Sequence, residues 1–73
     1  MKKGDRYIHY RNRKTYIVFD FCKIQINDEW VNAVIYYLEK NPSMLFCREL
    51  TEFRAKFQKI QNHCTERFVK KTL

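Results

Sequence analysis

The sequence predicts a mainly β fold with a minor α component: an antiparallel sheet that curls into a small, partly open barrel, and one short C-terminal helix. Three observations predict it. β-branched and aromatic residues dominate two long stretches, 15–26 and 30–39, as they do in strands. Turn-forming residues separate these stretches. Beyond residue 50 the apolar positions are spaced by three and four, as on one face of a helix. The length of 73 residues predicts a single domain, 1–73.

The first two strands are predicted to form a β-hairpin. A Gly-Asp turn signal precedes a short strand over residues 7–10. The polar tetrapeptide RNRK follows, in which Asn12 tolerates a left-handed backbone. In the second strand, 15–26, both faces are apolar up to the middle apart from Asp20, and apolar residues then alternate with polar ones. This pattern is typical of a strand that is covered first and half-exposed later.

Two further strands complete the predicted sheet. The third covers residues 30–39, with a buried helix as the alternative for so short a run. Residues 27–29 form the turn before it. Residues 41–43, Asn-Pro-Ser, break the chain, because proline lacks the N–H that a strand ladder uses. A short fourth strand covers 44–47. Curling the sheet hides the edges that a flat sheet exposes.

The last third of the chain is predicted to be a helix followed by a tail. Thr51 is the expected N-cap, and Glu52 suits the positive end of the helix dipole. Asn62 is the expected end of the helix. Residues 62–73 then form a last short strand or a loosely packed tail. The apolar face of this helix consists of Leu50, Phe53, Phe57, Ile60 and Cys64.

Composition argues against membrane and secreted classes. No apolar run approaches the roughly 20 residues that cross a bilayer. The N-terminus, MKKGDRYIHY, lacks the apolar segment of a signal peptide. Three cysteines without a close pair do not make a disulfide framework. We therefore expect no membrane partner and a cytoplasmic location, in a bacterium or a phage-infected host.

The net charge of +7 is concentrated at the two ends of the chain. Residues 1–14 carry six Lys or Arg and one Asp, and residues 54–73 carry six Lys or Arg and one Glu. Residues 15–53 carry three basic against six acidic residues. Since the termini of small domains often lie close together, the two ends are expected to form one positive patch. Such a patch attracts polyanions, although a basic balance also serves solubility alone.

The order of several residues resembles a known family. Y-I-H-Y at 7–10 precedes Tyr16 and Val18, V-I-Y occupies 34–36, and L-F-C-R-E-L-T-E-F runs over 45–53. This order is similar to the domain of unknown function 1653 family of small bacterial and phage proteins. That family's pattern runs Tyr-x-His-Tyr, Tyr-x-Val, Val-Val-Tyr and Leu-Trp-Val-Arg-Pro-Leu before a Phe. The matching positions are Tyr7, His9, Tyr10, Tyr16, Val18, Val34, Tyr36, Leu45, Arg48, Leu50 and Phe53.

The resemblance implies an SH3-like barrel but no settled activity. It extends to Arg67, since Arg-Phe resembles the family's closing Pro-Arg-Phe. Phe46 stands where the family prefers Trp, Glu49 where it prefers Pro, and residues 40–43 replace a Gly-containing turn. A ligand contact in that turn is therefore not carried over, whereas the implied fold is unaffected.

Metal-binding and catalytic arrangements are not predicted. Structural zinc uses close pairs of Cys or His, and the one such pair here is adjacent and points apart on a helix. Cys22 and Cys47 are expected to be buried, inert thiols, and no carboxylate pair is expected in a cleft. Asp20 is expected to pair with a group such as Arg48 or to turn outward at a bulge. We expect no enzymatic activity, no metal and no cofactor.

Basic and aromatic residues of the N-terminal hairpin are the predicted binding site. Positive charge attracts phosphates, and bases stack on exposed rings. A strand places Tyr7 and His9 on one face, where His9 either hydrogen-bonds inside the barrel or donates to a bound ligand. Of the four aromatic residues between positions 10 and 21, at least half are expected in the core. The predicted site comprises Arg6, Tyr7, His9, Arg11, Arg13, Lys14, Arg48 and Arg67.

Two functions follow from these observations. The first is a non-enzymatic module that binds nucleic acid or a nucleotide through its basic, aromatic face. The alternative is a phage-encoded protein-interaction module that inhibits a host or defence protein, which the resemblance to phage proteins motivates. A homodimer that holds a nucleotide between its subunits is a variant of both.

Overall fold

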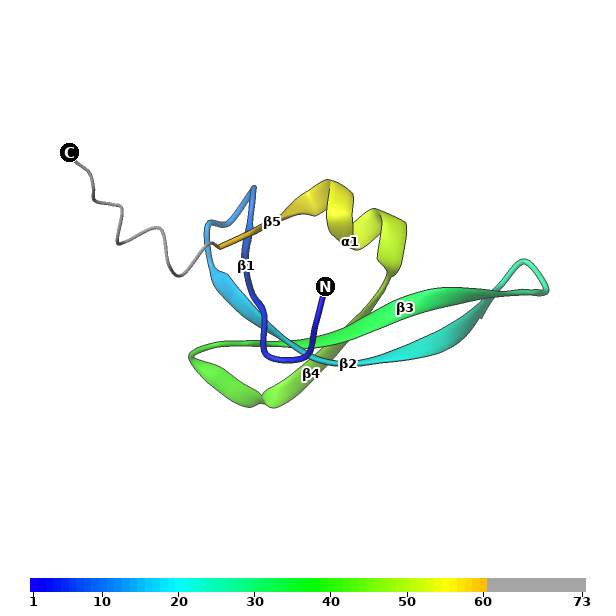
Figure 1. Cartoon of the computed structure of the whole chain (residues 1–73), viewed down its shortest axis with the longest axis horizontal. Coiled ribbons are helices and arrows are strands. Elements are labelled where there is room, and N and C mark those ends of the chain that lie inside the picture. Colours follow the sequence, from blue (N-terminus) through cyan, green and yellow to red (C-terminus); the bar gives the residue numbers. More distant parts are fainter. Residues whose placement is uncertain (61–73) are drawn as a thin grey trace.

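The structure, a computed structural model, describes residues 1–60 and is mainly β (Figure 1). Five antiparallel strands form one sheet in the order β4-β3-β2-β1-β5, with β4 and β5 at its edges. Neither edge strand pairs with the other, so the described sheet is not closed into a barrel. The mainly β prediction is confirmed. The elements are β1 (Arg6–His9), β2 (Thr15–Ile26), β3 (Glu29–Leu38), β4 (Asn41–Glu49), α1 (Leu50–Lys56) and β5 (Phe57–Lys59).

Strands β2 and β3 form a long hairpin that projects beyond the rest of the sheet (Figure 1). Its turn has positive φ at Asn27 (52°) and Asp28 (65°), the backbone region that tight hairpins need and that Asn and Asp tolerate. The predicted turn and third strand are confirmed. A register shift before Asp20 marks a bulge. Asp20 therefore turns toward solvent and pairs with Lys3 at 3.5 Å. The expected outward turn at a bulge is confirmed, and the alternative, pairing with Arg48, is wrong, since Arg48 pairs with Glu52.

The core lies between the helix and one side of the sheet. Phe53 of α1 is fully buried and stacks on Phe57, with ring centroids 4.1 Å apart. Its edge-to-face contacts reach Tyr7 at 5.1 Å and Tyr36 at 5.0 Å. We call the side of the sheet that faces this core the inner face and the opposite side the outer face. The buried cluster comprises Tyr7, Val18, Val34, Tyr36, Phe53 and Phe57.

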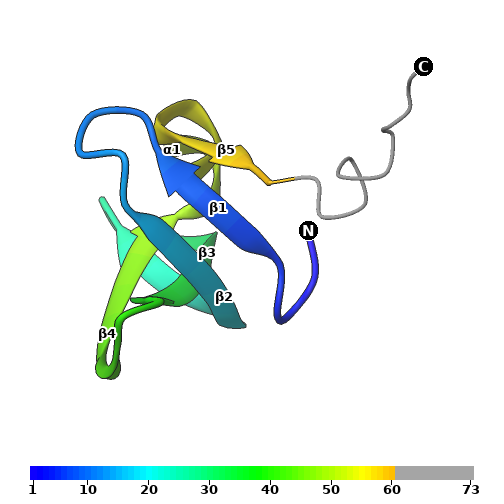
Figure 2. The same cartoon turned by 90° about the vertical axis from the view of Figure 1, so that its left-hand side faces the viewer.

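The two ends of the described chain lie close together, as expected for a small domain. Strand β1 lies between β2 and β5, and the register pairs Tyr7 with Lys59 (Figure 2). Lys59 also forms an ion pair with Asp5 at 3.4 Å. None of residues 1–60 belongs to a helix long and apolar enough to cross a membrane.

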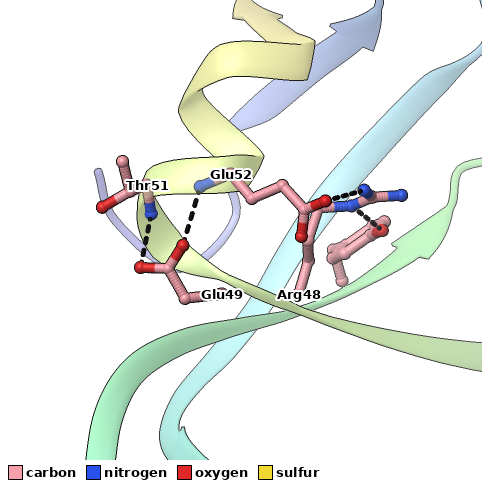
Figure 3. Close-up of polar contacts among 5 residues, drawn as sticks. Arg48, Glu49, Thr51 and Glu52 are labelled. Carbon is pink, nitrogen blue, oxygen red and sulfur yellow. Dashed lines mark hydrogen bonds and ion pairs between the residues drawn. The ribbon is translucent and has the colours of Figure 1, made fainter. Parts of the chain in front are cut away.

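The C-terminal helix is shorter than predicted, and its N-cap is Glu49, not Thr51. The Glu49 carboxylate accepts hydrogen bonds from the backbone N–H groups of Thr51 (3.1 Å) and Glu52 (3.0 Å) (Figure 3). The N-cap is thus two residues earlier than predicted, and a longer, acidic side chain binds the free N–H groups in place of the Thr51 hydroxyl. The α-helix ends at Lys56.

Phe57 was expected on the helix but belongs to strand β5, which the sequence did not predict. It pairs with His9 of β1. The four-residue step from Phe53 to Phe57 fits a continuous helix and also a helix followed by a strand, because the Phe57 ring faces the same core in both. The predicted helix end at Asn62 and the alternatives for residues 62–73 lie outside the described part of the chain.

Three smaller expectations are also wrong. Strand β4 already begins at Asn41, because an edge strand tolerates the missing N–H of Pro42. The left-handed residue of the β1–β2 loop is Arg13 (φ 63°) in place of Asn12. None of the four aromatic residues between positions 10 and 21 is fully buried, because the long hairpin extends past the core; Tyr16 alone packs against it.

Candidate functional site

An open groove of about 410 Å³ lies between the β1–β2 loop and the end of α1. A hydrogen bond of 3.0 Å from the Tyr10 N–H to the Lys56 carbonyl ties the loop to the helix. Figure 2 shows this loop beside α1. Three of the six lining side chains are cationic and one is a half-exposed tyrosine. The groove is lined by His9, Tyr10, Arg11, Arg48, Ala55 and Lys56.

The β1–β2 loop is ordered by side chains that bind its own backbone. His9 Nδ1 accepts hydrogen bonds from the N–H groups of Arg11 (3.0 Å) and Asn12 (3.4 Å). Asn12 Oδ1 accepts from the N–H of Lys14 at 2.8 Å, and Asn12 Nδ2 donates to Tyr16 Oη at 3.1 Å. Such local bonds fix a turn that has few apolar contacts. The loop therefore presents the Arg11 side chain from a defined backbone.

His9 lines the groove and, in its neutral form, still carries one N–H donor. Because its Nδ1 accepts two N–H groups, the proton of the neutral ring is on Nε2. Burial lowers the pKa of His9, and the charges of Arg48, Lys56 and Arg11 lower it further. These three cations are the ones that line the groove. Edge contact with Phe57 at 4.7 Å holds the ring in place.

Arg48 is held between β4 and α1 by contacts on three sides. Its Nε donates to Tyr36 Oη at 3.2 Å, and its Nη1 lies 3.4 Å from a carboxylate oxygen of Glu52 (Figure 3). The guanidinium carbon lies 5.8 Å from the centroid of the Phe57 ring. The Tyr36 hydrogen bond raises the pKa of Arg48. A guanidinium has five N–H donors, so these contacts leave donors for a ligand.

Aromatic rings continue from the groove along the sheet. His9 contacts Tyr16 with centroids 6.4 Å apart, and Tyr16 contacts Phe46 at 6.1 Å. Phe46 also stacks on Tyr36 at 5.6 Å. Phe46 and Tyr10 are exposed to solvent. Exposed rings next to fixed cations provide stacking surfaces beside phosphate-binding groups.

Other predicted site residues lie elsewhere. Tyr7 is buried in the core. Arg6 forms a forked ion pair with Glu39, with Nε–Oε2 at 3.0 Å and Nη2–Oε1 at 3.3 Å. Arg13 and Lys14 line a smaller depression of about 270 Å³ together with Glu39. Arg67 lies outside the described residues. Of the eight predicted residues, His9, Arg11 and Arg48 line the groove.

Sequence reasoning missed Tyr10 and Lys56. Tyr10 was grouped with aromatic residues expected mainly in the core. It directly follows the end of β1, where pairing stops and a side chain is free to leave the core. Lys56 carried no local signal, because its position depends on the helix ending there and on the bond to Tyr10.

The two described cysteines are free thiols on the outer face, with Sγ atoms 3.8 Å apart. Cys47 is exposed and Cys22 is half-buried, so the expectation that both are buried is wrong. Desolvation raises the pKa of the Cys47 thiol, and the hydrogen bond with Cys22 adds to this. Within residues 1–60, His, Cys, Asp and Glu do not form a group of three that could hold a metal ion.

Comparisons of this chain with protein-family models, curated proteins and solved structures find no match. The resemblance to the domain of unknown function 1653 family therefore stays a prediction.

Proposed function

We propose that this protein is a non-enzymatic module that binds phosphate-bearing ligands, with single-stranded nucleic acid as the favoured class. One observation carries the proposal: Arg11, Arg48, Lys56 and the neutral donor His9 converge on one open groove beside exposed Tyr10. Charged donors bind phosphate oxygens more strongly than neutral donors do. The cations supply affinity for any phosphate backbone, and the ring supplies a surface on which a base stacks.

The open shape of the groove favours a strand over a closed nucleotide pocket. Tyr10 lies on the loop and Phe46 lies on β4, so the exposed rings are distributed along the sheet. An extended ligand can place a phosphate at Arg48 and its neighbouring bases on the two rings. Such contacts are tolerant of sequence, because every base has a π-face.

The proposal includes an SH3-like architecture and a reducing, cytoplasmic location. The strand order β4-β3-β2-β1-β5 supports that architecture, as does the short helix α1 that lies between β4 and β5 in the sequence. Small barrels of this kind use open faces to bind oligonucleotides, which is an argument by analogy. The free thiols of Cys22 and Cys47 support the reducing compartment.

Fluorescence anisotropy with short single-stranded RNA and DNA oligomers tests the proposal. If three cations each release a counterion, the logarithm of the association constant falls with the logarithm of the salt concentration with a slope of about −2. The Lys56→Gln variant should reduce this slope by about 0.7. Lys23→Gln is the matched control, since Lys23 lies on the projecting hairpin. If neither oligomers nor nucleotides bind at low salt, the proposal is wrong.

The phage-encoded inhibitor of a host or defence protein is the second candidate. The apolar outer face of the sheet supports it, since exposed apolar surfaces mark contacts with proteins. A pull-down from bacterial lysate separates the two candidates. A partner that persists after nuclease treatment favours the protein-interaction module, and loss of every partner after nuclease favours the nucleic-acid module.

A further inference from the structure

The outer face of the sheet is largely apolar, and no element within residues 1–60 covers it. Paired residues of antiparallel strands point to the same face, and successive residues alternate. Val18 and Tyr36 form a pair that belongs to the core. The neighbouring pair, Ile17 and Tyr37, therefore points outward, and so does Leu45, which pairs with Tyr37.

The outer face continues along the hairpin beyond the bulge. Ile35 pairs there with Asp20, and Ala33 pairs with Cys22. The Cys22–Cys47 contact at 3.8 Å and the Phe19–Tyr37 contact at 6.4 Å show that these side chains meet on one side. Apolar residues on this face include Ile17, Phe19, Ile24, Ile35, Tyr37 and Leu45.

Side chains on the outer face pack against one another, but no described element covers them. Ala33 is only 1% exposed, because its neighbours close over its methyl group. Phe19 is 50% exposed and Leu45 is 52% exposed. Among the described elements, α1 packs through Phe53 on the inner face, and no strand lies over the outer one (Figure 1). Ile26, farther along β2, is 42% exposed on the same face, and a group of such large apolar side chains indicates a contact surface.

The charges on the outer face limit what can cover it. The ionisable carboxylates that alternation places there are Asp20, Glu29 and Glu49, and the face has no Lys or Arg on β2, β3 or β4. A polyanion is therefore repelled from it. Lys3 is the cation beside this face, where it pairs with Asp20 at 3.5 Å. The chain as a whole carries +7, so two copies repel each other less through this face than through their basic β1–β2 loops.

The size of the face fits a small, reversible interface. Its three strands have 12, 10 and 9 residues. Because β4 pairs only with residues 33–38 of β3, the face is three strands wide over part of its length and two strands wide over the rest. At about 3.3 Å per residue and about 4.8 Å between strands, it covers roughly 400 Å² in projection. Stable complexes bury about 800 Å² per partner. Two such sheets can pack face to face at about 10 Å, and twofold symmetry needs one patch that complements itself.

We infer that the outer face of β2, β3 and β4 is the contact surface of a reversible homodimer, in which a second copy packs its own outer face against it. This inference does not depend on the proposed function. Arg48 and the groove lie toward the inner face, which points away from the contact. The dimer therefore presents its two grooves to solvent, one on each side. One polyanion that reached both would bind with avidity.

Sedimentation velocity over a wide concentration range, in a reducing buffer of high ionic strength, tests the inference. We expect the mass to rise from the 9.1 kDa of one chain toward twice that value as the concentration increases. Leu45→Asp should stay at the mass of one chain, because two carboxylates would meet across the apolar contact. Trp30→Asp is the matched control: Trp30 is a 65% exposed apolar residue of β3, and its pairing with Gln25 places it on the opposite side. It should dimerise like the wild type.

Reaction of Cys47 with a maleimide, in a background that carries Cys22→Ser and Cys64→Ser, identifies the occupant of the face. In a homodimer Cys47 becomes protected only at concentrations where the mass doubles. A chain that stays monomeric at every concentration overturns the inference: protected Cys47 then points to the chain's own C-terminal segment, and reactive Cys47 to a bare face. Equal loss of the dimer in Leu45→Asp and Trp30→Asp, with unchanged circular dichroism, also overturns it.

Discussion

The groove and the outer face are opposite surfaces with opposite chemistry, and one strand contributes to both. From β4, Phe46 and Arg48 point to the inner side, where Arg48 lines the groove. Leu45 and Cys47, which alternate with them, point to the outer side. A shift of one residue in the register of β4 would exchange the two sets. The pairing of β4 with β3 therefore fixes both surfaces together.

The two surfaces also differ in what holds their side chains. On the inner side, α1 covers the part of the sheet that forms the core, and Arg48 is fixed by Tyr36, Glu52 and the Phe57 ring. On the outer side, side chains touch one another but nothing described covers them. The comparison predicts that substitutions on the inner side change stability and ligand binding, whereas substitutions on the outer side change self-association.

The largest expected effect is on the free energy of unfolding. Phe53→Ala should lower it by about 3–5 kcal/mol, because Phe53 is 0% exposed and its removal leaves a cavity. Since small domains are stable by only about 5–15 kcal/mol, this variant should be close to unfolding. Phe19→Ala, on the half-exposed outer face, should cost about 1 kcal/mol or less in the monomer. Urea denaturation followed by circular dichroism, at concentrations below self-association, measures both; equal losses would contradict the comparison.

The second effect is on ligand affinity. Arg48→Gln should weaken binding of a single-stranded oligomer by about 1.5–3 kcal/mol, roughly 10- to 150-fold, because it removes a charged hydrogen-bond donor fixed in the groove. Arg48→Lys should recover part of the loss, since it keeps the charge but not the fork. Arg13→Gln, outside the groove, removes the same charge and is the control. Equal weakening by Arg48→Gln and Arg13→Gln would show that only net charge matters.

The third effect is the pH dependence of binding. The pKa of His9 is lowered in the free protein, and a bound phosphate would raise it by offsetting the nearby cations. The bound state then takes up a proton, so affinity should increase as the pH falls from the pKa of the bound state to that of the free state. His9→Asn removes the titrating group and keeps an oxygen that can accept the loop N–H groups. Affinity measured across this range should rise for the wild type and stay nearly flat for His9→Asn.

The strands and the hairpin turn were predictable because their signals are local. Alternation and β-branched residues identified β2 and β3, and the Asn27-Asp28 turn has the backbone that those residue types favour. The end of the helix was not predictable in this way. Phe57 faces the same core from a strand as it would from a helix, so only its pairing with β1 decides between them.

The candidate site was predictable in part for the same reason. His9 and Arg11 belong to one loop, and a basic, aromatic hairpin marks both. Lys56 joins them only because β5 returns beside β1, which no local pattern reports. Arg6 and Tyr7 have the right composition for the site, but Glu39 binds the first and the core buries the second. These are long-range contacts, which a single sequence does not specify by composition.

The smallest expected effect concerns Glu49, the last residue of β4, whose carboxylate caps α1. Its hydrogen bonds from Thr51 and Glu52 lower its pKa in the folded state. A lowered folded-state pKa gives stability that is present above the unfolded-state pKa and is lost as the pH falls through the folded-state value. Glu49→Gln should therefore lower the melting temperature slightly at neutral pH and leave it unchanged in acid, where the wild-type carboxyl is protonated. Thermal unfolding at both pH values measures this, with Glu29→Gln, an acidic residue beside the distal turn of the same outer face, as the control. Equal shifts for both variants would assign the effect to net charge, and a shift for Glu49→Gln alone would show that the cap links the edge strand to the helix that covers the core.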